Sequence, residues 1–289
     1  MKFITFSRGG KPAPGVWLGG GRIADLSGVA GSMVELIAGG PEALAAARRV
    51  TNDTDASLSA DEVALEAPIP WPRKNVFCVG RNYVDHVAEG ARAMGTETKL
   101  PIVPQFFTKA PTAVNAPGAP VRLDNSLTKL LDYEVELAVV IGKAGRDIPA
   151  ERAYEHVFGY TIANDVTARD LQRRHDQWFK GKSLDTTLPL GPWIVDAEEI
   201  GDPTTLELSL TVNGEERQRA KASQMIFDIP AIIASLSAGM TLEPGDVIAT
   251  GTPSGVGFAM DPPQGLKDGD VVVARIDRIG ELVSPIKAV

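Results

Sequence analysis

The ten residues from Asp132 to Ile141 constrain the fold more than any other stretch of the chain. They begin with alternating charged and apolar residues and end fully apolar. This pattern predicts a β-strand that is buried along its second half and opens onto a polar site at its start. Side chains two residues apart on a strand point the same way, about 7 Å apart. Glu134 and Glu136 therefore share one face, and the opposite face carries Val135, Leu137, Val139 and Ile141.

Two carboxylates on one face of a buried strand repel each other and are costly to bury without a partner. A divalent cation bound between them is the usual remedy. The alternative is a strand end whose glutamates face water. From these ten residues alone, we weigh a bound cation and a water-facing strand end about evenly.

Composition indicates a soluble globular protein of one large domain, with or without a small companion. The chain has 289 residues, of which 44% are hydrophobic and 23% charged. Its net charge is -8 and it contains no basic block, which argues against nucleic acid or an anionic membrane as partner. We find no signal peptide and no apolar stretch long enough to span a bilayer, so we expect a cytoplasmic protein.

The single cysteine, Cys78, excludes an intramolecular disulfide and any zinc site built from several cysteines. It lies in an apolar run, which favours a buried, inert thiol.

The chain divides into two predicted domains. Residues 1–66 form a small N-terminal unit, and the proline-rich residues 67–73 link it to a main domain over 74–289. In the small unit we expect strands at 2–6, 15–18 and 22–26, helices at 32–38 and 41–50, and a polar loop at 51–61.

In the main domain the same signals predict alternating strands and helices. Expected strands cover 76–80, 105–110, 159–165, 188–193, 247–250 and 271–276, with a hairpin around Asn213-Gly214. Expected helices cover 83–94, 150–157, 166–178 and 229–237, the last capped by Asp228. The irregular segment 90–104 resembles a lid or binding loop. The Gly-Lys-Ser triplet at 181–183 lacks the spacing of a phosphate loop.

His86 and Glu89 are separated by three residues, so a helix would place them on one face. A carboxylate beside an imidazole fixes its orientation and raises its basicity, as a general base requires. Taken alone, such a pair is more often a surface ion pair.

Asp165, Arg169 and Gln172 would form one stripe of the predicted helix at 166–178. The simpler role for Asp165 is a helix N-cap, which would leave the other two unexplained. His156 is most simply structural or on the surface, and His175 faces solvent. The glycine-rich stretch 251–257 leaves backbone N–H groups free to approach an anion, although such turns are common.

Taken together, these motifs resemble the fumarylacetoacetate hydrolase family. They follow one another in the family's order and cover about residues 75 to 285. The matching pieces are residues 79–86 with Glu89, 107–109, 132–137, Gly159-Tyr160, Asn164-Asp165, 168–172, Trp178, Lys182, 189–192, Asn213-Gly214, 244–246 and 251–253.

The resemblance implies an α+β, mainly β fold: a rolled, mixed or antiparallel sheet core with flanking helices, a small N-terminal α/β domain, and a homodimer. It also implies one Mg²⁺ or Mn²⁺ per subunit, bound by Glu134, Glu136 and Asp165. Oxygen ligands of this kind suit a hard cation.

The substrates implied by the resemblance are small dioxo or 2-oxo dicarboxylic acids. The leading hypothesis is hydrolysis of a C–C bond in a 2,4-dioxo acid, with water activated by His86 and Glu89. Lys182 would complete the catalytic group. The implied substrate-binding residues are Arg169, Gln172, Thr252, Arg81 and Lys109.

Relatives with the same acidic triad also decarboxylate or isomerise 2-oxo acids, so both activities are alternatives. A protein that binds a metal and a 2-oxo acid without turnover is a further alternative. Many relatives have Lys-Pro-Pro where this chain has Lys109-Ala-Pro111, a difference that affects the stiffness of the loop more than its chemistry.

Overall fold

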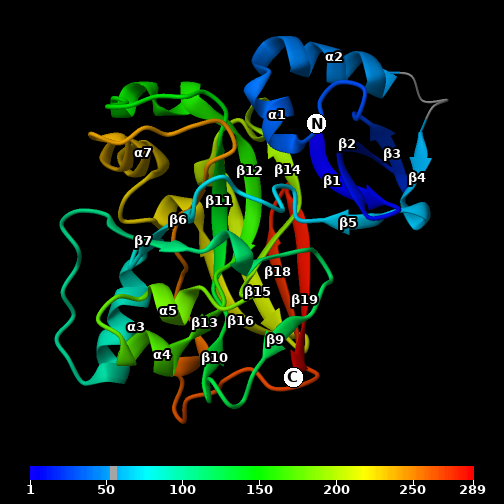
Figure 1. Ribbon diagram of the computed structural model, residues 1–289. Helices are drawn as coiled ribbons and strands as arrows, with labels where there is room; N and C mark the ends of the chain where they lie inside the picture. Colours follow the sequence, from blue (N-terminus) through cyan, green and yellow to red (C-terminus); the bar gives the residue numbers. More distant parts are fainter. Residues whose placement is uncertain (53–56) are drawn as a thin grey trace.

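The protein is built around one large mixed β-sheet (Figure 1). The computed structural model describes residues 1–52 and 57–289, and within them this sheet contains twelve strands. The hydrogen-bonded order is β4-β3-β2-β1-β14-β12-β11-β17-β6-β7, with β5 paired to β1 and β8 paired to β14. The strands are β1 (Lys2–Arg8), β2 (Lys11–Gly19), β3 (Arg22–Asp25), β4 (Leu58–Ser59), β5 (Ala64–Glu66), β6 (Val76–Gly80), β7 (Gln105–Lys109), β8 (Val114–Asn115), β11 (Val135–Ile141), β12 (Val157–Asn164), β14 (Leu188–Asp196) and β17 (Val247–Ala249).

A second sheet packs against the middle of the first. Its order is β16-β15-β18-β19-β9. These strands are β9 (Val121–Leu123), β15 (Glu207–Val212), β16 (Glu215–Lys221), β18 (Val271–Ile276) and β19 (Gly280–Ala288), and a short separate ladder joins β10 (Leu131–Asp132) to β13 (Thr167–Ala168).

β11 is buried on both faces, which confirms the predicted alternation. Its odd-numbered residues from Val135 to Ile141 pack into a core shared with β15 and β18 of the second sheet. Ala138 and Val140 belong to a different core, with Phe3 and Leu36 of the N-terminal residues. The face that carries Glu136 is therefore an interior face, and water does not surround it.

Helices cover the two ends of the large sheet. α1 and α2 pack on the N-terminal strands, whereas α3, α4 and α5 gather near β10 and β13 (Figure 1). The helices are α1 (Met33–Ala38), α2 (Gly40–Asn52), α3 (Val84–Met94), α4 (Arg169–Arg174), α5 (Phe179–Lys182), α6 (Ala197–Ile200) and α7 (Ile229–Ser237). None of the helices in the described ranges is long and apolar enough to cross a membrane.

The helix predicted over 166–178 is wrong at both ends. Thr167 lies in β13 and pairs with Asp132, so the helix begins only at Arg169. It ends at Arg174 because His175 has an extended backbone, and a separate turn of helix, α5, follows. The β-branched Val166 and Thr167 accept the extended conformation readily.

Three other local predictions also need correction. The helix predicted at 150–157 is a 3₁₀ helix over Ala150–His156. The expected loop at 51–61 contains the end of α2, strand β4 and a 3₁₀ turn at Ala60–Glu62, and its residues 53–56 lie outside the described ranges. Glu134 directly precedes β11 and is not part of it.

Other elements match the expected ones. Asp228 caps α7 by accepting a hydrogen bond from the N–H of Ala231, and Asn213-Gly214 connects β15 to β16. The N-terminal strands join the large sheet through β1, where Phe3 pairs with Ile194 of β14. The division into domains at residues 66 and 74 stays a prediction.

Leu137 tests how much the contact between the two sheets stabilises the fold. Its side chain is fully buried between them, so Leu137→Ala should lower the free energy of unfolding by about 2–5 kcal/mol. Val283→Ala, on a side chain that is 39% exposed, should cost less than about 1 kcal/mol. Equilibrium unfolding in urea measures both, and equal losses would contradict the described core.

Candidate active site

Three buried carboxylates meet where β11 begins and β12 ends. The strands are antiparallel and Val135 pairs with Asn164, so Glu134 and Glu136 lie beside Asp165. One oxygen from each carboxylate lies within 4.8 Å of the others. All three side chains are almost completely buried. The structure thus brings together the acidic triad that the sequence predicted.

Two lysines contact this triad from different sides. The Nζ of Lys182 donates to Glu134 Oε2 and to Asp165 Oδ2, at 2.7 Å in both cases. The Nζ of Lys109 lies 2.8 Å from the other oxygen of Asp165 and donates to the carbonyl of Val166. Each oxygen of Asp165 therefore faces a different ammonium group.

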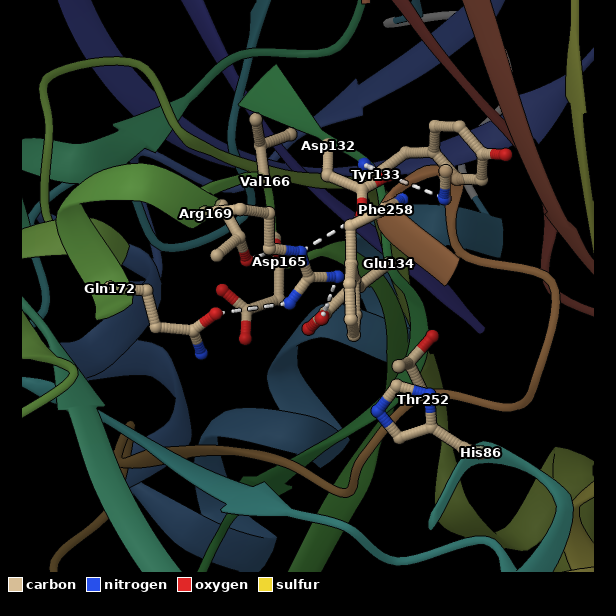
Figure 2. A network of polar contacts seen from close by, with 12 residues as sticks. His86, Asp132, Tyr133, Glu134, Asp165, Val166, Arg169, Gln172, Thr252 and Phe258 are labelled. Carbon is tan, nitrogen blue, oxygen red and sulfur yellow. Dashed lines mark hydrogen bonds and ion pairs between the residues drawn. The ribbon is translucent and has the colours of Figure 1, made fainter. Parts of the chain in front are cut away.

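Arg169 links the triad to a fourth buried carboxylate, Asp132 (Figure 2). Its Nε donates to Asp132 Oδ2 at 2.9 Å, and its Nη2 lies 2.6 Å from Glu134 Oε1. Its Nη1 donates to Gln172 Oε1 at 3.3 Å. The guanidinium also packs on the ring of Phe258, 4.5 Å from its centre. These contacts hold Arg169 in one orientation.

The glycine-rich loop 251–257 binds carboxylates, as its composition suggested, and the carboxylates belong to the protein itself. The N–H of Gly251 donates to Glu136 at 2.7 Å, that of Gly255 to Glu89 at 2.8 Å, and that of Gly257 to Asp132 at 2.8 Å. A Cβ on Gly255 would lie 1.8 Å from the carbonyl oxygen of Arg217, so only glycine fits there.

The pKa values of Glu134 and Glu136 are shifted in opposite directions. Burial would raise the pKa of Glu134, but the charges of Lys182 and Arg169 lower it below the ordinary value. Burial raises the pKa of Glu136 well above the ordinary value, and the charges of Asp165 and Glu134 raise it further. Burial lowers the pKa of Lys182, yet Asp165 and Glu134 outweigh burial and raise it.

The triad fits a divalent cation on the chemistry of its donors. Three buried carboxylate oxygens are the ligands that Mg²⁺ and Mn²⁺ prefer. The raised pKa of Glu136 reflects its burial and, in addition, repulsion from Asp165 and Glu134, and a bound cation would relieve that repulsion. Glu134, Glu136 and Asp165 are therefore the residues that would hold the cation.

His86 and Glu89 form a buried pair, so the interpretation as a surface ion pair is wrong. His86 Nδ1 lies 2.9 Å from Glu89 Oε1, and the side chains are 12% and 9% exposed. Because both oxygens of Glu89 accept hydrogen bonds, we assign the proton to Nδ1, which leaves the lone pair on Nε2. In the view of Figure 2 the imidazole ring lies below Glu134.

A cavity of about 800 Å³ lies next to this network. His86, Arg169, Gln172 and Phe258 contribute to its wall. Arg81, Lys99 and Arg173 add positive charge, and Glu97 and Asp176 add negative charge. Lys109 and Thr252 are not among its lining residues. Lys109 is fully buried behind Asp165, and the hydroxyl of Thr252 donates to the carbonyl of Val135 at 3.0 Å.

The sequence interpretation gave no role to three residues of the site. Asp132 accepts hydrogen bonds from Arg169, Tyr133, Gly257 and Phe258. Phe258 packs against both Arg169 and Arg173. The sequence could have pointed to Asp132, because a charged residue at the start of a buried strand needs a partner. No sequence pattern pointed to Phe258 or Arg173.

The two remaining histidines have no part in this network. The Nδ1 of His156 lies 2.9 Å from the carbonyl oxygen of Lys143, at a buried position. His175 is exposed, as the sequence predicted, and lines the cavity.

Comparison with known proteins identifies relatives over almost the whole chain. Residues 75–287 match the family described as "Fumarylacetoacetate (FAA) hydrolase C-terminal". The oxaloacetate tautomerase YisK of Bacillus subtilis is 50% identical over 273 residues, which cover 92% of this chain and 89% of that protein.

Solved structures share the same fold over their full length. The fumarylacetoacetate hydrolase of Exiguobacterium antarcticum is 43% identical with a TM-score of 0.85, and each chain is covered completely. The maleylpyruvate hydrolase of Sphingobium sp. SYK-6, solved in complex with manganese (II) ion and pyruvate, is 32% identical with a TM-score of 0.81. That comparison covers 100% of this chain and 99% of the other.

The opposite shifts of the two glutamates predict how a cation changes stability with pH. The raised pKa of Glu136 favours the folded state at low pH, and this contribution is lost as pH rises above the ordinary value of 4.5. The lowered pKa of Glu134 has the opposite effect, since its contribution is lost as pH falls below 4.5. A cation needs Glu136 ionised, so its binding should release a proton.

Titration calorimetry with Mg²⁺ or Mn²⁺ in two buffers of different ionisation enthalpy measures this proton. We expect proton release in the pH range above 4.5 where folded Glu136 still holds its proton, and less of it in Glu136→Gln. The increase in melting temperature on adding cation should grow from about pH 5 to about pH 8. Binding that moves no proton in the wild-type protein would contradict the assignment of Glu136.

Proposed function

Because the chain belongs to the fumarylacetoacetate hydrolase family, we propose that it is a divalent-cation-dependent enzyme that interconverts the keto and enol forms of oxaloacetate. Identity of 50% to an oxaloacetate tautomerase supports the choice of reaction. The observation that carries the proposal is the convergence of a buried acidic triad and the His86–Glu89 pair beside one cationic cavity.

The reaction needs a proton transfer and little else. In the ketonising direction, C3 of the substrate gains a proton and the enol oxygen loses one, so no water is consumed and no C–C bond breaks. Negative charge develops on the C2 oxygen during the transfer. A site for this reaction therefore needs a proton carrier beside C3 and positive charge beside that oxygen.

A divalent cation held by Glu134, Glu136 and Asp165 would supply Lewis-acid chemistry, withdrawing electron density from the 2-oxo group and so acidifying the neighbouring C–H. His86 Nε2 would carry the proton, since its Nδ1 is held by Glu89. The ammonium of Lys182 adds positive charge next to two of the carboxylates.

Arg169 and Gln172 are the proposed partners of the carboxylate next to the 2-oxo group. Both line the cavity, and the hydrogen bond between them fixes their relative orientation. Arg169 is already paired with Asp132 and Glu134, so its position does not depend on the substrate. A rigid, preformed guanidinium suits a planar carboxylate.

The second carboxylate of the substrate finds positive charge at the outer part of the cavity. The guanidinium groups of Arg81 and Arg173 line this part of the cavity. Arg173 packs on the ring of Phe258, 5.1 Å from its centre. Glu97 and Asp176 also line the cavity, but its four lysine and arginine side chains outnumber them, and this local positive charge favours a dicarboxylic acid.

Hydrolysis of a C–C bond in a 2,4-dioxo acid remains a second candidate. The same His86–Glu89 pair could take a proton from water, as the sequence motifs suggested, and a maleylpyruvate hydrolase is among the relatives. The implied homodimer also stays a prediction, which sedimentation would test. Mg²⁺ and Mn²⁺ are equally compatible with the donors.

Replacing His86 tests the proposed proton carrier. His86→Gln should slow the decay of the enol absorbance of oxaloacetate by about 10²–10⁴-fold, with cation affinity unchanged. Glu89→Gln should slow it less, because the imidazole remains. Arg174→Gln, at an exposed residue that does not line the cavity, serves as the control. Wild-type rates in His86→Gln would overturn this role.

Product analysis separates the candidate reactions. We expect the cation-loaded enzyme to equilibrate enol and keto oxaloacetate, and removal of the cation with a chelator to abolish the acceleration. NMR would detect acetate and pyruvate from acetylpyruvate if the enzyme hydrolyses C–C bonds. Pyruvate and CO₂ from oxaloacetate would indicate decarboxylation. Either product without tautomerisation would overturn the proposal in favour of that reaction.

Arg173 tests recognition of the second carboxylate. Arg173→Gln should raise KM for oxaloacetate roughly threefold to tenfold, because it removes one solvent-exposed charge interaction of about 1 kcal/mol. kcat should change little. Arg174→Gln is a matched control, since Arg174 is its exposed neighbour and does not line the cavity. Equal effects of the two variants would contradict a specific role for Arg173.

A further inference from the structure

Three hydrogen bonds close a ring around Val135, the residue between Glu134 and Glu136. The N–H of Val135 donates to Gln218 Oε1 at 2.9 Å, and Gln218 Nε2 donates to the hydroxyl of Thr252 at 2.8 Å. That hydroxyl donates to the carbonyl of Val135 at 3.0 Å. Both polar backbone groups of Val135 are thus bound by side chains.

The ring of hydrogen bonds binds the backbone of β11 beyond the point where its pairing with β17 ends. β17 pairs with β11 only from Ala138 to Val140, and Thr250 still donates to the carbonyl of Leu137. At Gly251, with φ of +103°, the chain turns away from β11. Val135 is fully buried, so its N–H and carbonyl need partners within the protein.

The partners come from two distant parts of the chain. Gln218 lies on β16, in the second sheet, and is 1% exposed. Its Nε2 also donates to the carbonyl of Pro253 at 2.8 Å. Thr252 belongs to the loop whose Gly251 binds Glu136. The amide of Gln218 therefore joins the second sheet, the loop and the backbone between the two glutamates.

We propose that Gln218 and Thr252 are positioning residues that set the spacing of Glu134 and Glu136 for a divalent cation. This inference rests on the cation site of the proposed function. It gives Thr252 a role different from the substrate binding predicted from the sequence. Gln218 is neutral, so its loss changes the geometry of the site without adding or removing charge near the cation.

A merely structural role would have a different signature. It would lower the stability of the variants but leave the cation affinity of the folded molecules unchanged. A positioning role lowers that affinity, because partners that orient metal ligands typically contribute 10–100-fold to it. Affinity measured on folded protein therefore separates the two roles.

The first experiment compares Gln218→Met with Gln224→Met. Methionine keeps the length of the side chain but cannot bond Val135 or Thr252. Gln224 is the matched control, because it is exposed and bonds only locally, to the N–H of Lys221. Electron paramagnetic resonance of free Mn²⁺ gives the dissociation constant, and circular dichroism confirms folding. We expect Mn²⁺ affinity to fall roughly 10–100-fold in Gln218→Met and to stay unchanged in Gln224→Met.

Variants of Thr252 keep the test decisive if Gln218→Met does not fold. Thr252→Ser retains the hydroxyl and should bind Mn²⁺ like the wild type. Thr252→Val removes the hydroxyl at similar volume and should weaken Mn²⁺ binding. Wild-type affinity in folded Gln218→Met, or in Thr252→Val, would overturn the positioning role. Failure of the wild-type protein to bind Mn²⁺ would instead overturn the cation site itself.

Discussion

The rest of the structure depends on the burial of four carboxylates at one end of the β11–β12 pair. Asp132, Glu134, Glu136 and Asp165 are each at most 4% exposed. Carboxylates that are buried away from water are tolerated only with compensating charge and hydrogen bonds. Two lysines, one arginine and the backbone N–H groups of a glycine-rich loop supply that compensation, and their arrangement determines the shape of the site.

The four carboxylates are compensated in different ways, and the proposed function depends on this difference. Asp132 and Glu134 are neutralised by Arg169 and Lys182, so they hold the polar wall of the cavity in place. Glu136 receives one backbone hydrogen bond and repulsion from its acidic neighbours, which makes it the group that most needs a cation. The same loop orients the His86–Glu89 pair through Gly255. The proposed proton carrier and the proposed cation site are thus connected through one loop.

Much of this site could be predicted from local patterns. Strand periodicity placed Glu134 and Glu136 on one face of a buried strand, and the motifs identified Asp165, His86 and the family. The helix over 166–178 failed because pairing of Thr167 with Asp132, far away in sequence, overrides the local preference. The role of the His86–Glu89 pair was ambiguous, because the spacing of two residues on a helix does not reveal whether they are buried. The structure shows that they are, with the glycine-rich loop bonded to Glu89.

The sequence by itself determined the alternation of β11, the inventory of carboxylates and cations, and the family, because these depend on periodicity and on motifs within short stretches. Tertiary structure alone decided which charges compensate one another, how Lys109 and Lys182 divide the oxygens of Asp165, and that Gln218 bonds the backbone of Val135. The physical reason is that such contacts join residues separated by 17 to 83 positions. Their geometry follows from strand register and sheet packing, which no local pattern encodes.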